Sequence, residues 1–353
     1  MKKESKYFNA LNLILKANYK TISKLKLEFT SYEKAFNSFE GKIGKIDIDN
    51  EWQKLIRQNI RLILTDDQEY PALLKEIPFP PLGIYVKGEL PENNETRIAI
   101  VGTRKATTVG RDIAECFAKE LGENGLTIVS GLALGIDSAS HLGALKAKAK
   151  TIAVLGNEIG SFYPRQNHRL AKQILETGGC IISEYPLGSP TYRDNFLARN
   201  RIISGLSTAI IIIEAPFESG SLNTARYAIE QNREIFVVPG PLNNKNYDGS
   251  LKLLREGARL ITSAKDVLED LGIETKTLPT SRQAKKEKQK SIIDGISDKN
   301  QITILKALEE SGTPLTIDKI SFLAKLEPQA ANQAISFLII EGIVKETEKG
   351  FII

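Results

Sequence analysis

The 353-residue sequence contains few of the residues that build disulfide frameworks and metal sites. It has two cysteines, Cys116 and Cys180, and two histidines, His141 and His168, in different parts of the chain. Two cysteines cannot form a disulfide framework or supply a cysteine-rich metal site. We therefore expect a reduced chain with no metal ion and no other cofactor.

Long apolar segments are absent as well. The longest purely apolar run is Ala209–Ile213, whereas a membrane-spanning helix needs ~20 such residues. No charged-then-apolar leader opens the sequence. We therefore expect a cytoplasmic protein without a membrane span. The composition, 41% hydrophobic and 26% charged, is typical of globular proteins, and the length suggests two or three domains.

The middle of the chain alternates short apolar runs with helical patterns. The runs predict strands at Arg97–Val101, Leu126–Val129, Thr151–Leu155, Cys180–Ser183, Ala209–Ile213 and Glu234–Val238. Such alternation implies parallel pairing through right-handed crossovers, which is an α/β fold with a Rossmann-like, doubly wound, mostly parallel sheet. Ligands of these sheets bind beyond the carboxyl ends of the strands. The candidate loops begin at Gly102, Gly131, Gly156, Glu184, Glu214 and Gly240.

The flanks predict further domains. A small helical domain resembling a SAM or helix-hairpin-helix domain is expected over residues 1–62, followed by an extended Rossmann-like domain over 63–275. Residues 276–295 include a polar stretch and are expected to form a flexible linker. Residues 296–353 show three helical patterns and then an alternating stretch, which is the pattern of a winged helix.

The net charge of +5 is unevenly distributed. Residues 97–266 hold 21 basic and 16 acidic groups, whereas residues 292–353 hold 6 basic and 9 acidic groups. The basic excess favours an anionic partner for the Rossmann-like domain. A winged helix that reads duplex DNA presents a basic face to phosphate, so the acidic C-terminal domain is expected to serve protein interaction or regulation instead.

Two glycine-rich segments follow the first two predicted strands. Val101–Arg104 is not the G-x-G-x-x-G fingerprint, but it places backbone amides, a hydroxyl and Arg104 at a helix start, which suits phosphate. A tight turn with a solvated arginine explains it equally well. Ser130–Asp137 is followed by His141, and here helix capping with a local hydrogen bond is the preferred interpretation.

Three later segments combine arginine, aromatic and hydroxyl residues. Tyr163–Leu170 sets an aromatic beside cationic side chains, which suits nucleic acid or simply a helix start with exposed charges. Asn195–Ser207 holds Arg199 and Arg201, which either bind an anion or neutralise the carboxylates of Glu184 and Glu214. Glu218–Ala225 forms an anion nest or an ordinary helix cap.

Together these segments resemble the DprA/Smf (DNA-processing protein A) family. The resemblance runs in order through Tyr70-Pro71, Pro80-Pro81, Tyr85–Gly88, Ile98–Arg104, Ser130–Asp137 with His141, Tyr163-Pro164 with Asn167 and Leu170, Ser183–Pro186, Arg199–Ser207, Glu214 with Ser219–Ala225, and Val238–Gly240. The chain departs from the family at two places. In the family, Phe-Pro usually precedes the Arg-Asn-Arg segment, whereas this chain has Leu197-Ala198 there. At the position of Leu251, the family usually has Asn.

The resemblance implies a non-enzymatic protein of natural transformation and recombination. Such proteins bind and protect incoming single-stranded DNA and load the RecA recombinase onto it past single-strand-binding protein, and they dimerise through the Rossmann-like domain. The residues expected to bind DNA phosphates are Gly102, Thr103, Arg104, Gly131, Arg165, Arg199, Arg201, Gly220 and Ser221. Tyr163 and Phe196 are the candidates for base stacking.

A second hypothesis is a nucleotide-binding or nucleotide-processing enzyme. Phosphoribohydrolases with related Rossmann-like folds use a Pro-Gly-Gly-x-Gly-Thr-x-x-Glu signature, and Ser219–Thr224 takes its place here when Thr224 is aligned. The position of the catalytic glutamate then falls on Tyr227, which argues against glycosidic hydrolysis but leaves nucleotide binding open.

Overall fold

The structure, a computed structural model, describes residues 2–38, 46–275, 298–311, 314–340, 343–347 and 350–352. The chain divides into two compact units, 1–275 and 276–353, and each is treated by itself. The predicted linker over 276–295 lies entirely outside the described residues. In the described part of the chain, no helix is long and apolar enough to cross a membrane.

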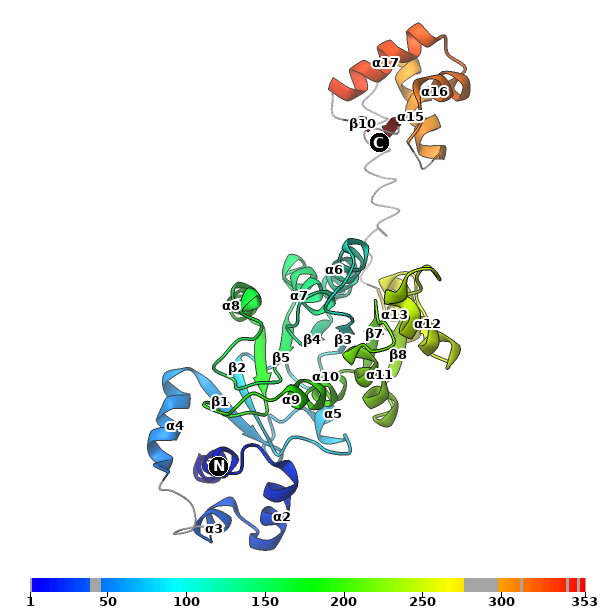
Figure 1. Cartoon of the computed structure of the whole chain (residues 1–353). Coiled ribbons are helices and arrows are strands. Elements are labelled where there is room, and N and C mark those ends of the chain that lie inside the picture. Colours follow the sequence, from blue (N-terminus) through cyan, green and yellow to red (C-terminus); the bar gives the residue numbers. More distant parts are fainter. Residues whose placement is uncertain are drawn as a thin grey trace. The chain divides into compact units, whose positions relative to one another are not determined.

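A nine-stranded sheet forms the centre of the first unit (Figure 1). Its spatial order is β1-β2-β6-β5-β4-β3-β7-β8-β9. The strands are β1 (Ile60–Leu64), β2 (Gly83–Gly88), β3 (Arg97–Val101), β4 (Thr127–Ser130), β5 (Thr151–Val154), β6 (Cys180–Ser183), β7 (Ala209–Ile212), β8 (Glu234–Val237) and β9 (Arg259–Leu260). Neighbours from β6 to β9 pair in parallel, while β1 and β2 pair antiparallel at one edge. The expectation of an α/β fold with a large, mostly parallel sheet is confirmed.

Helices cover both faces of this sheet. They are α5 (Ala72–Lys75), α6 (Thr108–Glu123), α7 (Ile136–Lys146), η1 (Arg165–Asn167), α8 (His168–Glu176), α9 (Arg193–Ala198), α10 (Asn200–Gly205), α11 (Gly220–Glu230), η2 (Lys245–Tyr247), α12 (Asp248–Arg255) and α13 (Ala264–Asp270). In β7, Ile211 packs in the core beneath α6 and α7, whereas Ile210 and Ile212 pack in the core with α10 and α11. Because successive side chains of a strand point to opposite faces, burial on both sides explains the continuous apolar run.

Four N-terminal helices pack beside the β1–β2 edge (Figure 1). They are α1 (Lys2–Ile14), α2 (Tyr19–Phe29), α3 (Tyr32–Asn37) and α4 (Ile48–Arg57). The hydroxyl of the fully buried Tyr85 on β2 donates to Asn9 Oδ1 at 2.9 Å and accepts from Asn12 Nδ2 at 3.2 Å. This buried contact fastens α1 to the sheet. Strand β1 begins at Ile60, inside the region predicted to be helical, because a short apolar run does not distinguish a strand from a helix.

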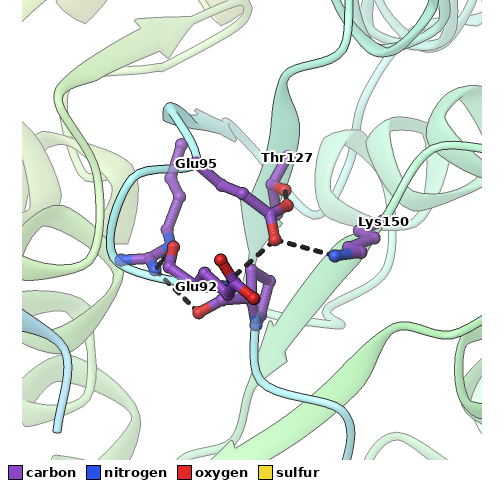
Figure 2. A network of polar contacts seen from close by, with 6 residues as sticks. Glu92, Glu95, Thr127 and Lys150 are labelled. Atoms are coloured by element: carbon purple, nitrogen blue, oxygen red, sulfur yellow. Dashed lines mark hydrogen bonds and ion pairs between the residues drawn. The ribbon is translucent and has the colours of Figure 1, made fainter. Parts of the chain in front are cut away.

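A polar network closes the amino end of the central strands (Figure 2). The guanidinium of the buried Arg97 donates to the backbone oxygen of Glu92 at 2.6 Å. The Glu95 carboxylate accepts from Lys150 Nζ at 2.7 Å and from Thr127 Oγ1 at 3.4 Å. Burial acts to raise the pKa of Glu95, but the hydrogen bonds, led by the one from Lys150, lower it overall. The loop from β2 to β3 is thereby tied to β4 and to the segment before β5.

The described residues of the second unit form three helices and a strand pair. These are α15 (Lys299–Ser311), α16 (Ile317–Ala324), α17 (Pro328–Ile340), β10 (Lys345–Thr347) and β11 (Gly350–Ile352). The strands pair antiparallel, and the backbone of Phe351 also pairs with Leu315. Ile304, Ile320 and Leu338 contribute to its separate apolar core.

Replacing Tyr85 with Phe tests the contact between α1 and the sheet. The change removes the donor to the buried Asn9 Oδ1 and one of the two acceptors of Asn12 Nδ2, which keeps the backbone oxygen of Glu184, so we expect the free energy of unfolding to fall by about 1–3 kcal/mol. Urea unfolding measures the loss. Tyr192→Phe is the matched control, because Tyr192 is half exposed. Loss of its hydroxyl is expected to change the free energy of unfolding by less than about 0.5 kcal/mol. Equal stability of the two variants would contradict the assignment.

Candidate functional site

The loops after β3, β4 and β7 join at the carboxyl edge of the sheet. The Thr103 amide donates to the backbone oxygen of Glu214 at 2.7 Å, and the Ile136 amide donates to Thr103 O at 3.3 Å. Gly135 has φ +81, and a Cβ there would lie 2.3 Å from Thr103 O, so only glycine fits. The loops are therefore packed against one another before any ligand is considered.

The fully buried carboxylate of Glu214 organises this packing further. It accepts from the Thr107 amide at 2.9 Å, from Thr107 Oγ1 at 2.5 Å and from Asn246 Nδ2 at 3.1 Å. A Cβ on Gly110 would lie 2.4 Å from the carboxylate, so the glycine admits it against the start of α6. Among the described residues, no arginine forms an ion pair with Glu214, and neutral donors satisfy it instead.

Arg199 is buried beneath the loops, with 4% of its surface exposed. Its Nη1 donates to the backbone oxygens of Gly131, at 2.8 Å, and of Val154, and its Nε donates to Asn200 Oδ1 at 3.2 Å. Burial lowers the pKa of Arg199 to about 10, although the charge of Asp137 opposes that shift. The guanidinium thus joins the loops after β4 and β5. From the sequence, Arg199 was instead expected to contact phosphate.

The second arginine of this segment meets a carboxylate. Arg201 Nη2 lies 2.5 Å from Glu184 Oε2, and both side chains are only 12% exposed. This ion pair agrees with the alternative that the sequence left open, in which an arginine neutralises Glu184.

Asp137 and His141 make separate contacts on α7. Asp137 Oδ2 accepts from the Gly131 amide at 3.1 Å, and burial raises the pKa of this carboxyl. His141 Nδ1 lies 2.8 Å from Thr151 Oγ1, whose proton goes to a backbone oxygen, so Nδ1 carries the donated hydrogen. Nε2 has no hydrogen-bond partner among the described residues. The expected local bond between Asp137 and His141 is not among the described contacts; each bonds elsewhere.

At most glycines of this edge, other residues of the protein occupy the space that a side chain would fill. A Cβ on Gly102 would lie 2.5 Å from Ile136, and one on Gly131 would lie 2.7 Å from the Arg199 guanidinium. Gly220 is different, because its nearest neighbour to such a Cβ would be Leu197 at 3.6 Å. The expected close approach of a ligand to backbone is therefore sterically open at Gly220, at the first position of α11. Ser221 is buried beside it, with its hydroxyl 2.6 Å from that of Ser219.

Four predicted residues remain at the surface. The guanidinium carbon of Arg104 lies 5.7 Å from the ring centroid of Phe196, and the Tyr163 ring lies 5.4 Å from the same centroid. Arg165 is exposed two residues after Tyr163. Within the described chain neither Arg104 nor Arg165 forms an ion pair. We call Arg104, Tyr163, Arg165 and Phe196 the cation–aromatic row.

Helix α9 carries the central ring of this row. Phe196 lies against Gly156 at the end of β5, where a Cβ would come within 2.8 Å of Phe196 Cα. On the other side of α9, Asn223 Nδ2 donates to the backbone oxygen of Leu197 at 3.2 Å. The start of α11, with the open Gly220, is thereby held next to the row.

Two exposed apolar side chains at this edge were not singled out from the sequence. Phe217, in the loop after β7, is 62% exposed, and Leu242, in the loop after β8, is 84% exposed. Apolar residues in loops follow no periodic pattern, so their spacing in the sequence does not predict whether they are buried or exposed. The only sequence signal was their place: each lies a few residues beyond the carboxyl end of a predicted strand.

The groups exposed at this edge are suited to recognition. Exposed guanidinium groups bind anions, and exposed rings stack on planar groups. Of the two histidines, His141 is fully buried against Thr151, and His168 is exposed at the start of α8.

Comparisons with known proteins agree on one group of relatives. Residues 61–272 match the family described as DNA recombination-mediator protein A. Protein Smf of Escherichia coli is 42% identical over 225 residues, which are 64% of this chain and 60% of that protein, so the match spans less than two thirds of its length. Protein Smf of Synechocystis sp. is 38% identical over 302 residues, which are 79% of this chain and 73% of that protein.

Solved structures of the same group are also similar. The X-ray structure of DNA processing protein A from Streptococcus pneumoniae is 37% identical with a TM-score of 0.60, over 69% of this chain and 82% of that one. DNA processing protein A from Helicobacter pylori, whose structure concerns its single-stranded DNA binding mode, is 31% identical with a TM-score of 0.54, over 60% of this chain and 95% of that one.

The buried His141 predicts a pH dependence of stability. Burial, together with the nearby Arg199, lowers the pKa of His141 to about 3. The unfolded chain takes up this proton below its ordinary pKa of about 6.5 and the folded chain does not, so stability falls as the pH drops from about 6.5 towards 3. We expect this group to lower the free energy of unfolding by about 2 kcal/mol between pH 7 and pH 5.

Urea unfolding of His141→Asn and His168→Asn at both pH values measures this contribution. Asparagine retains a donor for Thr151 but takes up no proton, so His141→Asn should lose that part of the pH dependence. His168→Asn is the matched control, because it replaces the other histidine, which is exposed, and should keep the original dependence. The same pH dependence in both variants would contradict the assignment.

Proposed function

Because the chain belongs to the DNA recombination-mediator protein A family, we propose that it binds single-stranded DNA at the carboxyl edge of its sheet. The observation that carries the proposal is the cation–aromatic row, in which the exposed Arg104 guanidinium and Tyr163 ring, from two loops, lie within 5.7 Å of the half-buried Phe196 ring on α9. The single-stranded DNA binding mode of the Helicobacter pylori relative supports the same ligand class.

The row suits a single strand better than a duplex. Arginine side chains neutralise phosphates of any sequence, and base–aromatic stacking contributes about 1–3 kcal/mol per base. Stacking requires a base whose face is free, which a single strand offers and a duplex does not. Arg104 and Arg165 are therefore proposed to bind phosphates, while Tyr163 and Phe196 stack on bases.

The start of α11 adds a further phosphate contact. The first amides of a helix lack intrahelical partners and carry a partial positive charge. Gly220 is exposed at this position and has no side chain in the way, so a phosphate can approach its backbone. Arg199, Arg201 and Ser221 are then proposed to support the site from beneath rather than to touch DNA. The same holds for Gly102, Thr103 and Gly131, which the packed loops enclose.

The family resemblance extends the proposal beyond binding. We infer that the protein takes part in natural transformation and recombination in the cytoplasm, where it protects incoming strands and loads RecA past single-strand-binding protein. We also propose a homodimer formed through the Rossmann-like domain. The exposed edge strand β9 supports this, since Leu260 is 56% exposed and an unpaired edge is a template for association.

Binding is proposed in preference to catalysis. In the alternative of a phosphoribohydrolase-like enzyme, the catalytic glutamate position falls on Tyr227 of α11, and a phenol does not replace that carboxylate at neutral pH. The family relatives are described as DNA processing and recombination-mediator proteins.

The C-terminal unit is proposed to be a winged helix that contacts protein. Its three helices and antiparallel strand pair are consistent with that fold. The sequence from 292 to 353 carries 6 basic and 9 acidic groups, and the exposed side chains of α17 include Asn332, Gln333 and Phe337. A surface of this kind does not attract phosphate. Phe322, at 82% exposure on α16, adds apolar area that suits a protein partner.

Replacing Arg104 with Gln tests the DNA site. We expect the affinity for single-stranded DNA to fall about tenfold or more, because a charged hydrogen bond and the support of the Phe196 ring are lost together. The slope of log affinity against log salt should decrease by about 0.7 for the lost phosphate contact. Titrations with single- and double-stranded DNA at several salt concentrations measure both quantities.

Arg255→Gln is the matched control for this experiment. Arg255 is an exposed arginine at the far end of α12, without an ion pair in the described structure, and the change removes the same charge. It should bind DNA like the unchanged protein. If Arg104→Gln matches this control in affinity and salt slope, the cation–aromatic row is not the site.

Deletion of residues 292–353 separates the roles of the two units. Because the deleted part carries an acidic excess, we expect the affinity for single-stranded DNA to stay within about twofold of the full chain. The same titration measures it, with the folding of the shortened chain checked by its thermal unfolding. Abolished binding by a folded shortened chain would refute a protein-contacting role.

A further inference from the structure

The outer face of α8 carries a line of cations that begins at Arg165 of the cation–aromatic row and continues beyond the proposed site. Arg165, Arg169 and Lys172 are four and three residues apart, which places them on one side of η1 and α8. The opposite side, with Leu170, Ala171 and Ile174, is buried in the core. All three cations are exposed. We call Arg165, Arg169 and Lys172 the α8 ladder.

The charge of this ladder is not neutralised by the protein. None of its three side chains takes part in an ion pair within the described chain, whereas lysines on neighbouring elements, such as Lys150 and Lys146, do. The only carboxylate on the same helix is Glu176, which lies in its last turn. The first two turns of the face therefore present positive charge alone.

Aromatic and basic groups flank the start of the ladder. The rings of Phe162 and His168 lie 5.5 Å apart, and Lys87 Nζ of β2 lies 5.9 Å from the Phe162 centroid. On the other side, Tyr163, two residues before Arg165, lies against Phe196 of the cation–aromatic row. A cationic surface thus continues from the row onto α8 without an intervening carboxylate in residues 163–172.

The direction of α8 shows where this surface leads. The helix begins at the carboxyl edge, after β5, and runs back towards the start of β6. At a rise of about 1.5 Å per residue, the ladder is about 10 Å long, which is enough to meet a few successive phosphates of one strand. Its length is therefore that of a short stretch of one strand.

We propose that the α8 ladder binds the phosphates of the same single strand after it leaves the cation–aromatic row. This inference rests on the proposed function and adds a path to it: the strand turns off the carboxyl edge and follows the outside of α8. Arg169 and Lys172 contact only the part of the strand beyond the row, so they contribute to the binding of long oligonucleotides and not of short ones.

The test compares oligonucleotides of about 6 and about 20 nucleotides on the double variant Arg169→Gln/Lys172→Gln. Glutamine keeps helix propensity close to that of the original residues, so α8 is expected to stay folded. Affinity for the long strand should fall about tenfold, and its salt slope should decrease by about 1.4, for two lost phosphate contacts. Affinity for the short strand should change by less than about twofold.

Lys306→Gln/Lys319→Gln is the matched control. Both lysines are exposed on helices of the other unit and have no ion pair in the described structure, so the same two charges are removed elsewhere. This variant should bind both strands like the unchanged protein. An α8 variant that matches this control on the long strand overturns the proposal, and so does one that weakens both strands equally.

Arg104→Gln distinguishes failure of the ladder from failure of the row. If Arg104→Gln weakens both strands while the α8 variant binds normally, the proposed function stands and the α8 path is wrong. If Arg104→Gln binds both strands normally, the row itself is not the DNA site.

Discussion

The carboxyl edge of the sheet depends on one buried cation. Arg199 donates to backbone oxygens of two loops, and its charge is balanced by the nearby Asp137, which in turn accepts from the Gly131 amide. A guanidinium loses several kcal/mol of hydration when it is buried, and only such a set of acceptors compensates for this. Because the carbonyls must point at Arg199, the loops after β4 and β5 have little freedom, and Phe196 on the preceding helix is positioned with them.

Glu214 plays the complementary part on the other side of the same edge. Its carboxylate gathers the start of α6 and the Asn246 side chain, while its backbone oxygen accepts from Thr103. Two buried charges of opposite sign therefore hold the loops from below, and the exposed cations lie above them. In the proposed complex, the DNA strand therefore meets a preformed surface. Few protein loops must become ordered on binding, so the entropy cost that opposes binding is small.

Much of the fold was readable from the sequence, and the reasons are particular. Ala209–Ile213 is apolar throughout because β7 is covered on both faces, and Arg97–Val101 is followed by glycine because a Cβ on Gly102 would lie 2.5 Å from Ile136. The strand at Ile60–Leu64 was not readable, since its partner β2 lies about twenty residues away in sequence and the run itself is short. Residues 276–295, which are expected to be a linker, lie outside the described residues.

The sequence alone determined the alternation of strands and helices from β3 to β8, the family, and the set of polar residues gathered at one edge. It did not determine which of these residues face a ligand. Arg104 and Arg199 both stand in segments predicted to bind phosphate, yet one is exposed over Phe196 and the other is buried against carbonyls. Only the tertiary structure decided between them, because burial depends on what other segments place around a side chain, and those segments are distant in sequence.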